Sequence, residues 1–198
     1  MAIYVKKRLM RKLSISHRVD IINDPHVMAL QIDELIIICG YNKPMNKNLM
    51  MRKLMKVTLD DIPLIMVRDF NLHHPMWDTK YEGILPDPIT HEFMEWMDDN
   101  GFMVLNDRNK PTFISHQQDQ GTQTVIDLLI VNQFCPHEIT NHFDIRYSHS
   151  TGSDHFLICW WGEYELLPNW TAGELPFKKD PLVHDEWIDK WKIGRAHV

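Results

Sequence analysis

The sequence predicts an α/β fold, because short apolar runs typical of strands alternate with amphipathic segments typical of helices. Residues 27–32 and 35–39 are two such runs, and because only Asp33 and Glu34 separate them they indicate a hairpin. Residues 63–67 are almost entirely apolar, as expected for a strand that is buried on both faces. We therefore expect a hydrophobic sheet with helices packed against it.

Two helices and three further strands are expected along the rest of the chain. Residues 46–57 place Leu, Met and Val side chains at helical spacing. Asp87 and Pro88 form an N-cap followed by proline at the first helical position, and Gly101 is the matching C-terminal signal. The further strands are expected at residues 102–105, 124–131 and 155–161.

The chain is expected to hold one domain, at residues 1–163, since its 198 residues fit a single domain of ordinary size. Residues 164–192 are rich in proline, tryptophan and charge, and they indicate a linker or the start of a following region. Residues 193–198 resemble one reading frame of a widely used sequencing-library adapter. We expect this last segment to be a sequencing scar that takes no part in the fold.

The composition excludes several classes of protein. With 44% hydrophobic and 24% charged residues, the chain can build a core and does not resemble a disordered tail. It has no apolar run long enough to cross a bilayer and no signal peptide, so we expect no membrane partner. Three cysteines without a CxxC pair argue against a disulfide scaffold or a zinc ribbon. They favour an intracellular location, in the nucleus or the cytoplasm, over secretion.

The formal net charge of −6 is unevenly distributed. Residues 1–56 contain 11 Lys and Arg against 4 Asp and Glu, whereas the remainder contains 10 against 23. Such a division suits an enzyme that contacts phosphate with one part and holds a divalent cation with another. A solvated surface with one basic helix is the simpler interpretation, and charge alone favours it.

The apolar run at 63–67 leads directly into Asp69 and Asn71. Strand alternation would place these two side chains on the same side of the chain. A carboxylate and a carboxamide in that position can bind a cation and a phosphate oxygen together. The structural alternative is an Asx turn that ends the strand.

Two further motifs supply an aspartate within a strand and an Asp-His pair. Asp127 lies inside the apolar run 124–131, where a carboxylate is costly unless it is paired or functional. Asp154 and His155 follow the turn-forming residues 150–153, and histidine can exchange a proton near neutral pH. The structural alternatives are an aspartate hydrogen-bonded to a neighbouring loop and one exposed histidine among 12.

Together, the three motifs resemble those of the endonuclease/exonuclease/phosphatase superfamily, which carries GD-[FL]-N, an Asp in an apolar strand, and SDH. Residues 69–77, DFNLHHPMW, are similar to the DFN-x-HHP-x-W segment of the non-LTR retrotransposon branch. Three more segments resemble its LN…PTF step, its IDL motif and its tyrosine motif: residues 105–113, 126–128 and 40–44. The resemblance covers most of the chain, from about residue 2 to about residue 162. It implies a two-sheet sandwich flanked by helices, as in deoxyribonuclease I.

The resemblance also implies catalytic roles for five residues. His155 would act on the attacking water, and Asp127 would orient and stabilise its imidazole ring. Asp69 would assist the leaving oxygen, while Asn71 and Tyr41 would hold the scissile phosphate.

A divalent metal ion is implied as the cofactor, with Asp154 and Asp69 as its expected ligands. Mg²⁺ suits a site that has oxygen ligands and several waters, and Mn²⁺ is the alternative ion. The metal and fixed hydrogen-bond donors would supply most of the charge stabilisation.

DNA is the implied partner, together with a reverse transcriptase domain in an intact polyprotein. His73, His74 and Trp77 follow the DFN motif and are the expected nucleic-acid-binding residues, because an aromatic ring there can stack on a base. Packing beneath the loop is the alternative for Trp77 and the one that we favour, whereas we favour surface contact for the two histidines.

Two departures from the family pattern bear on activity. Arg68 stands where the family has glycine, which allows close backbone approach or an unusual backbone conformation. We expect the arginine to add bulk and a charge beside the metal site, where it would compete with the metal for Asp69. The N-terminal strands that normally supply an Asn and a metal-binding Glu are missing, and Glu34 in the hairpin turn is a poor substitute. We therefore expect little Mg²⁺-dependent nicking from the chain as given. A catalytically inert relic and a small-phosphoester phosphatase remain the alternatives to a DNA-nicking endonuclease.

Overall fold

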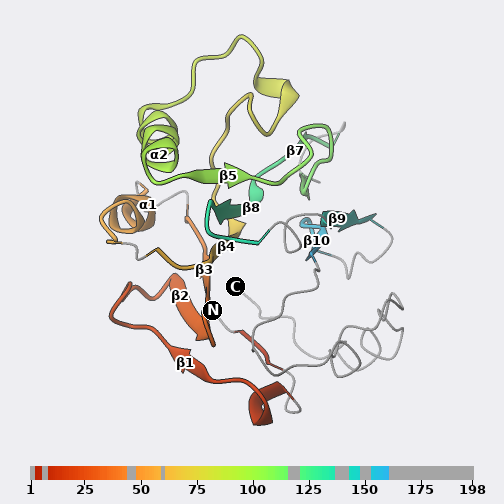
Figure 1. Ribbon diagram of the computed structural model, residues 1–198. Coiled ribbons are helices and arrows are strands. Elements are labelled where there is room, and N and C mark those ends of the chain that lie inside the picture. The colour runs from red at the N-terminus through yellow and green to blue at the C-terminus, as the bar shows by residue number, and fades with distance from the viewer. Residues whose placement is uncertain are drawn as a thin grey trace.

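The computed structural model describes residues 3–5, 9–43, 48–58, 61–115, 121–136, 143–147 and 153–160. Its centre is a six-stranded sheet in the order β1-β2-β3-β4-β8-β5 (Figure 1). Within this sheet β3 and β4 are parallel, and all other neighbours are antiparallel. The strands are β1 (Ile15–His17), β2 (Val27–Ile32), β3 (Leu35–Gly40), β4 (Leu64–Asp69), β8 (Asp127–Asn132) and β5 (Phe102–Val104).

Two pairs of short strands lie outside the main sheet. One pair joins β6 (Phe113–Ile114) to β7 (Gln123–Thr124), and the other joins β9 (Phe143–Arg146) to β10 (Leu157–Trp160). An isolated bridge between Phe113 and His155 brings the segment before β10 against β6. This bridge places the Asp-His motif beside the main sheet.

The helices cover one face of the sheet. α1 (Leu49–Leu54) and α2 (Pro88–Asp99) lie on the same side in Figure 1, and the 3₁₀ turns are η1 (Leu9–Arg11) and η3 (Thr79–Tyr81). Helix α2 begins as its sequence predicts, because the Asp87 side chain accepts a hydrogen bond from the Thr90 backbone N–H at 2.8 Å and Pro88 occupies the first turn. It ends at Asp99, and Gly101, two residues later, has a φ of 64°, a left-handed conformation that favours glycine.

The core has two parts, one on each face of the sheet. The larger part packs the sheet against the helices and includes the fully buried Phe93 and Trp77. The smaller part contains Leu129 and Val131, against which Trp160 of β10 packs from the other side. Strand β8 is buried at every position because both parts contact it. This two-sided burial accounts for its nearly continuous apolar sequence.

The predicted α/β class is confirmed, and most predicted elements are present within one or two residues of their expected bounds. The predicted strand at 124–131 is instead two strands, with Val125 and Ile126 between β7 and β8, so Asp127 begins a strand rather than lying inside one. Strands β1, β6 and β9 were not predicted, since each is short and none has a clear alternation. The expected linker at 164–192 and the adapter-like segment at 193–198 lie outside the described residues.

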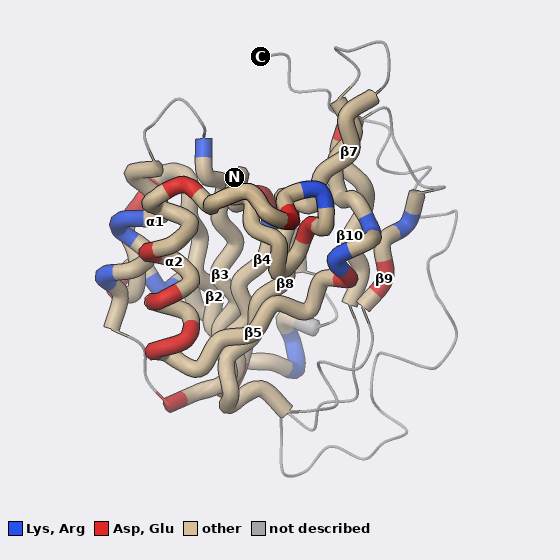
Figure 2. The backbone as a smooth tube through the Cα atoms, turned by 90° about the horizontal axis from the view of Figure 1, so that it is seen from above, with Lys and Arg blue, Asp and Glu red and all other residues tan. Residues whose placement is uncertain are grey.

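The charged residues of the two helices lie side by side (Figure 2). Arg52 of α1 and Glu92 of α2 form an ion pair at 3.2 Å, and Lys53 binds the buried Asp24 carboxylate at 2.6 Å. Within the described residues, the basic charge of α1 is therefore largely matched by acidic neighbours. This matching supports the simpler interpretation of the uneven charge. No helix of the described residues is long and apolar enough to span a membrane.

Candidate active site

The candidate site forms at one edge of the sheet, where β3 and β4 end and β8 begins. Because β3 and β4 are parallel, Tyr41 after β3 and Asp69 at the end of β4 reach the same edge. Strand β8 runs antiparallel to β4 and begins there with Asp127, which is the register partner of Asp69. The sheet topology thus brings together two motifs that are 58 positions apart in the sequence.

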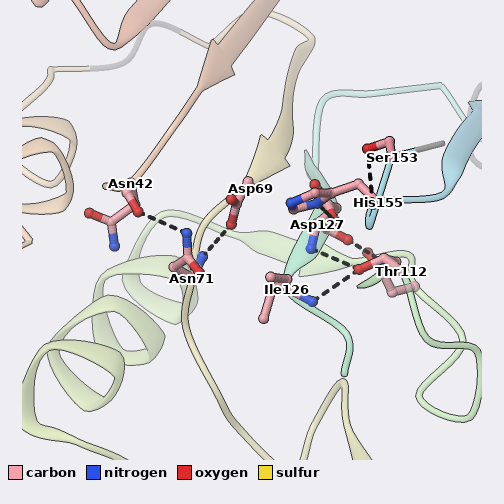
Figure 3. A network of polar contacts seen from close by, with 9 residues as sticks. Asn42, Asp69, Asn71, Thr112, Ile126, Asp127, Ser153 and His155 are labelled. Carbon is pink, nitrogen blue, oxygen red and sulfur yellow. Dashed lines mark hydrogen bonds and ion pairs between the residues drawn. The ribbon is translucent and has the colours of Figure 1, made fainter. Parts of the chain in front are cut away.

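Asp127 and His155 form the strongest polar contact of the site (Figure 3). His155 Nδ1 and Asp127 Oδ2 are 2.7 Å apart, and the Asp127 residue is only 7% exposed. The hydrogen bond to Asp127 raises the pKa of His155. With Nδ1–H donating to the carboxylate, Nε2 is the nitrogen left to take a proton, as in a base oriented by an acid.

Asp69 is a buried carboxylate, with 6% of its surface exposed, and it faces a second one. Burial and the negative charge of Asp127 raise its pKa from 3.8 to about 6, although His155 and hydrogen bonds from Asn71 act in the opposite direction. Two facing carboxylates whose charges disfavour one another are what a divalent cation neutralises. The electrostatics of this edge therefore favour a cation beside Asp69.

Asn71 reaches Asp69 through an Asx turn and not through strand alternation. The Asn71 backbone N–H donates to Asp69 Oδ1 at 3.0 Å, and Asn71 has a left-handed φ of 47°. Strand β4 ends at Asp69, so the alternation argument does not extend to Asn71. The two side chains are neighbours, as predicted, but the structural alternative, a turn that ends the strand, explains why.

Thr112 is a positioning residue that the sequence interpretation missed. It is fully buried, and its Oγ1 accepts hydrogen bonds from the backbone N–H groups of Ile126 and Asp127, at 3.0 and 2.9 Å. Its carbonyl oxygen accepts the N–H of Phe156 at 2.8 Å. One residue therefore holds both the start of β8 and the segment that follows His155. In the sequence, Thr112 was noted only as part of the Pro-Thr-Phe motif of the family. A threonine between a proline and a strand can, however, bind backbone groups in this way.

Asn42 is a second buried polar residue that was not singled out. Its backbone N–H donates to the Asp69 carbonyl at 2.9 Å, and its own carbonyl accepts the Asn71 side-chain amide at 3.0 Å. The available signal was an asparagine two residues after an apolar strand. Figure 3 shows the Asn71 side-chain amide pointing toward the backbone carbonyl of Asn42.

The remaining site residues lie around this centre. Tyr41 immediately precedes Asn42, donates its backbone N–H to the His26 carbonyl at 2.9 Å and makes an edge contact with the His26 ring. Asp154 is exposed, and its carbonyl accepts the Ile114 N–H at 2.8 Å. The negative charge of Asp154 helps to raise the pKa of His155, so the two groups are close.

The three expected nucleic-acid-binding residues differ in exposure. Trp77 is fully buried and its indole N–H donates to the Leu72 carbonyl at 3.2 Å, so in this structure its ring packs in the core and is not open to a base. His73 is half-buried and stacks on Tyr81 with a centroid distance of 4.5 Å. His74 is also partly exposed and accepts the Met76 N–H on Nδ1 at 3.1 Å. Burial lowers the pKa of both histidines, which favours their neutral form.

The expected competition between Arg68 and the metal for Asp69 is not seen. Arg68 is exposed whereas Asp69 is buried, because adjacent strand residues point to opposite faces of the sheet. Among the described residues, the side chain of Arg68 forms no ion pair with Asp69. The replacement of glycine by Arg68 affects the backbone instead, since Arg68 has a φ of 122°, a region that favours glycine.

The donor chemistry fits a divalent cation only in part. Asp69 offers carboxylate oxygen, and the repulsion from Asp127 favours a positive charge there. Within the described part of the chain, however, no group of three or more His, Cys, Asp and Glu side chains is placed to hold a metal ion. A cation at this edge would therefore rely on few protein ligands and several waters, which is the usual coordination of Mg²⁺.

Comparison with protein families agrees with this geometry. Residues 35–159 match the model of the family described as endonuclease-reverse transcriptase, and this match spans the Tyr41, Asp69, Asp127 and His155 segments. The chain belongs to this family. No curated protein matches the sequence.

Solved structures with the same fold belong to the endonuclease/exonuclease/phosphatase superfamily. The endonuclease domain of TRAS1, a telomere-specific non-LTR retrotransposon, superposes with a TM-score of 0.59 at 15% identity, covering 78% of this chain and 70% of that one. The 3′-5′ exonuclease NExo from Neisseria meningitidis gives a TM-score of 0.53 at 14% identity, over 76% of this chain and 71% of that one. An AP endonuclease from Archaeoglobus fulgidus gives 0.52 at 13% identity, over 77% and 70%. These likenesses confirm the expected two-layer, deoxyribonuclease-I-like fold.

Proposed function

We propose that this chain is a metal-dependent phosphodiesterase domain, the DNA-nicking endonuclease of a non-LTR retrotransposon. One observation carries the proposal: the Asp127–His155 pair, 2.7 Å apart, lies beside a second carboxylate, Asp69, at the sheet edge. A base, its orienting acid and an adjacent anionic group are the parts that hydrolysis of a phosphodiester needs. The family match and the TRAS1 fold direct the proposal to DNA and to a retroelement.

The proposed mechanism divides the work between the two sides of the site. His155 takes a proton from the attacking water on Nε2, and Asp127 holds the imidazole orientation and stabilises the imidazolium that forms. On the other side, Asp69 assists the leaving oxygen while the Asn71 carboxamide and the Tyr41 hydroxyl bind the phosphate.

Mg²⁺, or Mn²⁺ in its place, would be held by Asp69 with help from Asp154, and when bound it would stabilise the negative charge on the phosphate oxygens. The Asp69 carboxylate is buried and is repelled by the negative charge of Asp127, whereas the Asp154 residue is exposed. Removal of the cation should therefore leave the Asp127–His155 pair in place while abolishing turnover.

The test is conversion of supercoiled plasmid to open circle, with Mg²⁺ and with chelator. Because the described residues hold no cluster of three potential ligands, the assay compares the chain alone with the chain joined to the N-terminal strands of an intact family member. We expect weak nicking from the first form and chelator-sensitive nicking from the second. His155→Ala should abolish this activity. His91→Ala is the matched control, since His91 is an exposed histidine of α2 whose ion pair within the described part of the chain is with Glu95, at 3.5 Å.

Two outcomes would redirect the proposal. No nicking by either form would favour an inert relic, an alternative that the strained backbone of Arg68 also supports. Hydrolysis of small phosphomonoesters without plasmid nicking would favour a phosphatase. A 3′ phosphatase from Neisseria bound to product DNA hairpin shares the fold, with a TM-score of 0.54 at 12% identity over 78% of this chain and 71% of that one.

A further inference from the structure

Asn42 contacts every residue of the turn from Asp69 to Asn71. Its backbone N–H donates to the Asp69 carbonyl at 2.9 Å, and its side-chain amide donates to the Phe70 carbonyl at 2.8 Å. Its own carbonyl accepts the Asn71 side-chain amide at 3.0 Å. The same Asn42 amide donates to Asn48 Oδ1 at 2.8 Å, so it also ties the turn to the start of α1.

The orientation of the Asn42 carboxamide is fixed by these partners. The Phe70 carbonyl can only accept, so the Asn42 nitrogen must face it, because the opposite orientation would set two oxygens against one another. Asn42 is fully buried, and water cannot replace a lost bond. The carboxamide therefore has one favourable orientation, and the turn is built around it.

The turn needs external support because the sheet no longer provides it. Strand β4 ends at Asp69, and beyond it Asn71 adopts a left-handed φ of 47°. The Asx bond from the Asn71 N–H to Asp69 Oδ1 fixes one side of the turn, at 3.0 Å. Asn42 fixes the other side. Its backbone N–H binds the Asp69 carbonyl, its side-chain amide binds the Phe70 carbonyl, and its backbone carbonyl binds the Asn71 side-chain amide.

We propose that Asn42 is the positioning residue of this turn: its buried side-chain amide holds the Phe70 carbonyl, which keeps the Asn42 backbone carbonyl facing the Asn71 carboxamide and so fixes the direction of that carboxamide. Asn42 does not touch the substrate in this scheme and acts only through Asn71. Its effect on turnover rests on the proposed function, but its effect on the turn does not.

Asn132 provides a matched control for Asn42. It is an equally buried asparagine, 3% exposed, at the far end of the same sheet. Its Oδ1 accepts the Leu64 N–H at 3.0 Å and its amide donates to the Ile62 carbonyl at 2.8 Å. Asn42→Ala and Asn132→Ala therefore remove similar buried hydrogen bonds at opposite ends of β4, and we expect both to lower stability.

The distinguishing measurement is native-state hydrogen exchange at the Asn71 backbone N–H, followed by NMR and referred to the global unfolding of each variant. We expect Asn42→Ala to lower this protection by about tenfold or more, because one local buried hydrogen bond accounts for a change of that size. Asn132→Ala should leave it unchanged. If Asn42→Ala does not fold, Asn42→Ser, which keeps a shorter donor, is compared with Asn132→Ser in the same way.

In the nicking assay, Asn42→Ala should lower kcat about tenfold or more with little change in KM, since a misdirected carboxamide costs transition-state binding. Unchanged Asn71 protection in Asn42→Ala, or an equal loss in Asn132→Ala, would overturn the inference. If no form of the chain nicks DNA, the proposed function fails, and the exchange comparison decides the role of Asn42 by itself.

Discussion

Replacement of Arg68 by glycine should stabilise the protein although it removes an entire side chain. Arg68 is an exposed residue in the fifth position of β4, and its φ is 122°. A residue with a Cβ atom adopts that conformation only at a cost, whereas glycine adopts it freely. The side chain itself packs against little, because it is exposed. The backbone should therefore decide the sign of the change.

The magnitude follows from two opposing effects. A side-chain-bearing residue in a sparsely populated backbone region costs on the order of 1–3 kcal/mol. Glycine in a strand lowers the free energy of unfolding by about 0.5–1 kcal/mol relative to alanine, since its backbone loses more conformational entropy on folding. The net gain for Arg68→Gly is therefore about 0.5–2 kcal/mol, which for a domain of this size raises Tm by roughly 1–8 °C.

Urea denaturation followed by circular dichroism measures this gain, and two variants separate its causes. Arg68→Ala removes the charge but keeps the Cβ atom, so its free energy of unfolding should stay within about 0.5 kcal/mol of the parent. Ser16→Gly places glycine at an exposed position of β1 that has an ordinary φ, and it should lose stability. Equal stabilisation by Arg68→Ala and Arg68→Gly would assign the effect to the charge and refute the backbone argument.

Three further predictions follow from the site. In a form that nicks DNA, His155→Ala, Asp127→Ala and the double variant should slow single-turnover nicking to a similar extent, because the pair acts as a unit, and fully additive losses would contradict the pairing. Thr112→Val should cost about 1–3 kcal/mol in urea denaturation, because it leaves two buried N–H groups without an acceptor, whereas Thr112→Ser should retain most of the stability. The pKa of Asp69 is higher in the folded state than in the unfolded state, so in the absence of metal the parent should become less stable as the pH rises from about 4 to about 6. We expect its free energy of unfolding to fall by up to about 3 kcal/mol relative to that of Asp69→Asn. If the free energies of unfolding of the two proteins vary with pH in the same way, the pKa of Asp69 is not raised in the folded state.

The elements that could be predicted from the sequence are those with a strong local signal. The apolar runs of β2, β3 and β4 and the capped, amphipathic α2 lie where they were expected. The division between β7 and β8 was not predictable from periodicity, because Val125 and Ile126 are as apolar as the strand that follows. What separates the two strands is Thr112 Oγ1, which takes the N–H groups that a continuous ladder would use. That contact is between distant segments, and no local pattern reports it.

The residues of the candidate site also differ in whether the sequence could predict them. The sequence singled out Asp69, Asp127 and His155, because charged or titratable groups next to apolar runs are conspicuous. Asn42 and Thr112 were missed, since neutral polar residues are common and their role depends on burial, which only the fold reveals. Arg68 was recognised as a departure for two reasons, its charge and the backbone conformation that glycine allows, and its φ of 122° supports the second.

The costly features of this protein are concentrated at the site, and their placement argues for function. Among the described residues, four that are not glycine have positive φ, and Arg68 and Asn71 are two of them. A third, Asn48, is the residue whose side chain accepts the Asn42 amide, so it belongs to the same network. The same turn also carries the buried carboxylate whose charge is disfavoured, Asp69. Selection for stability alone would relax the backbone strain at Arg68, because that residue is exposed and its replacement by glycine does not disturb the core. Their joint presence around one turn is what a geometry maintained for binding a charged group requires.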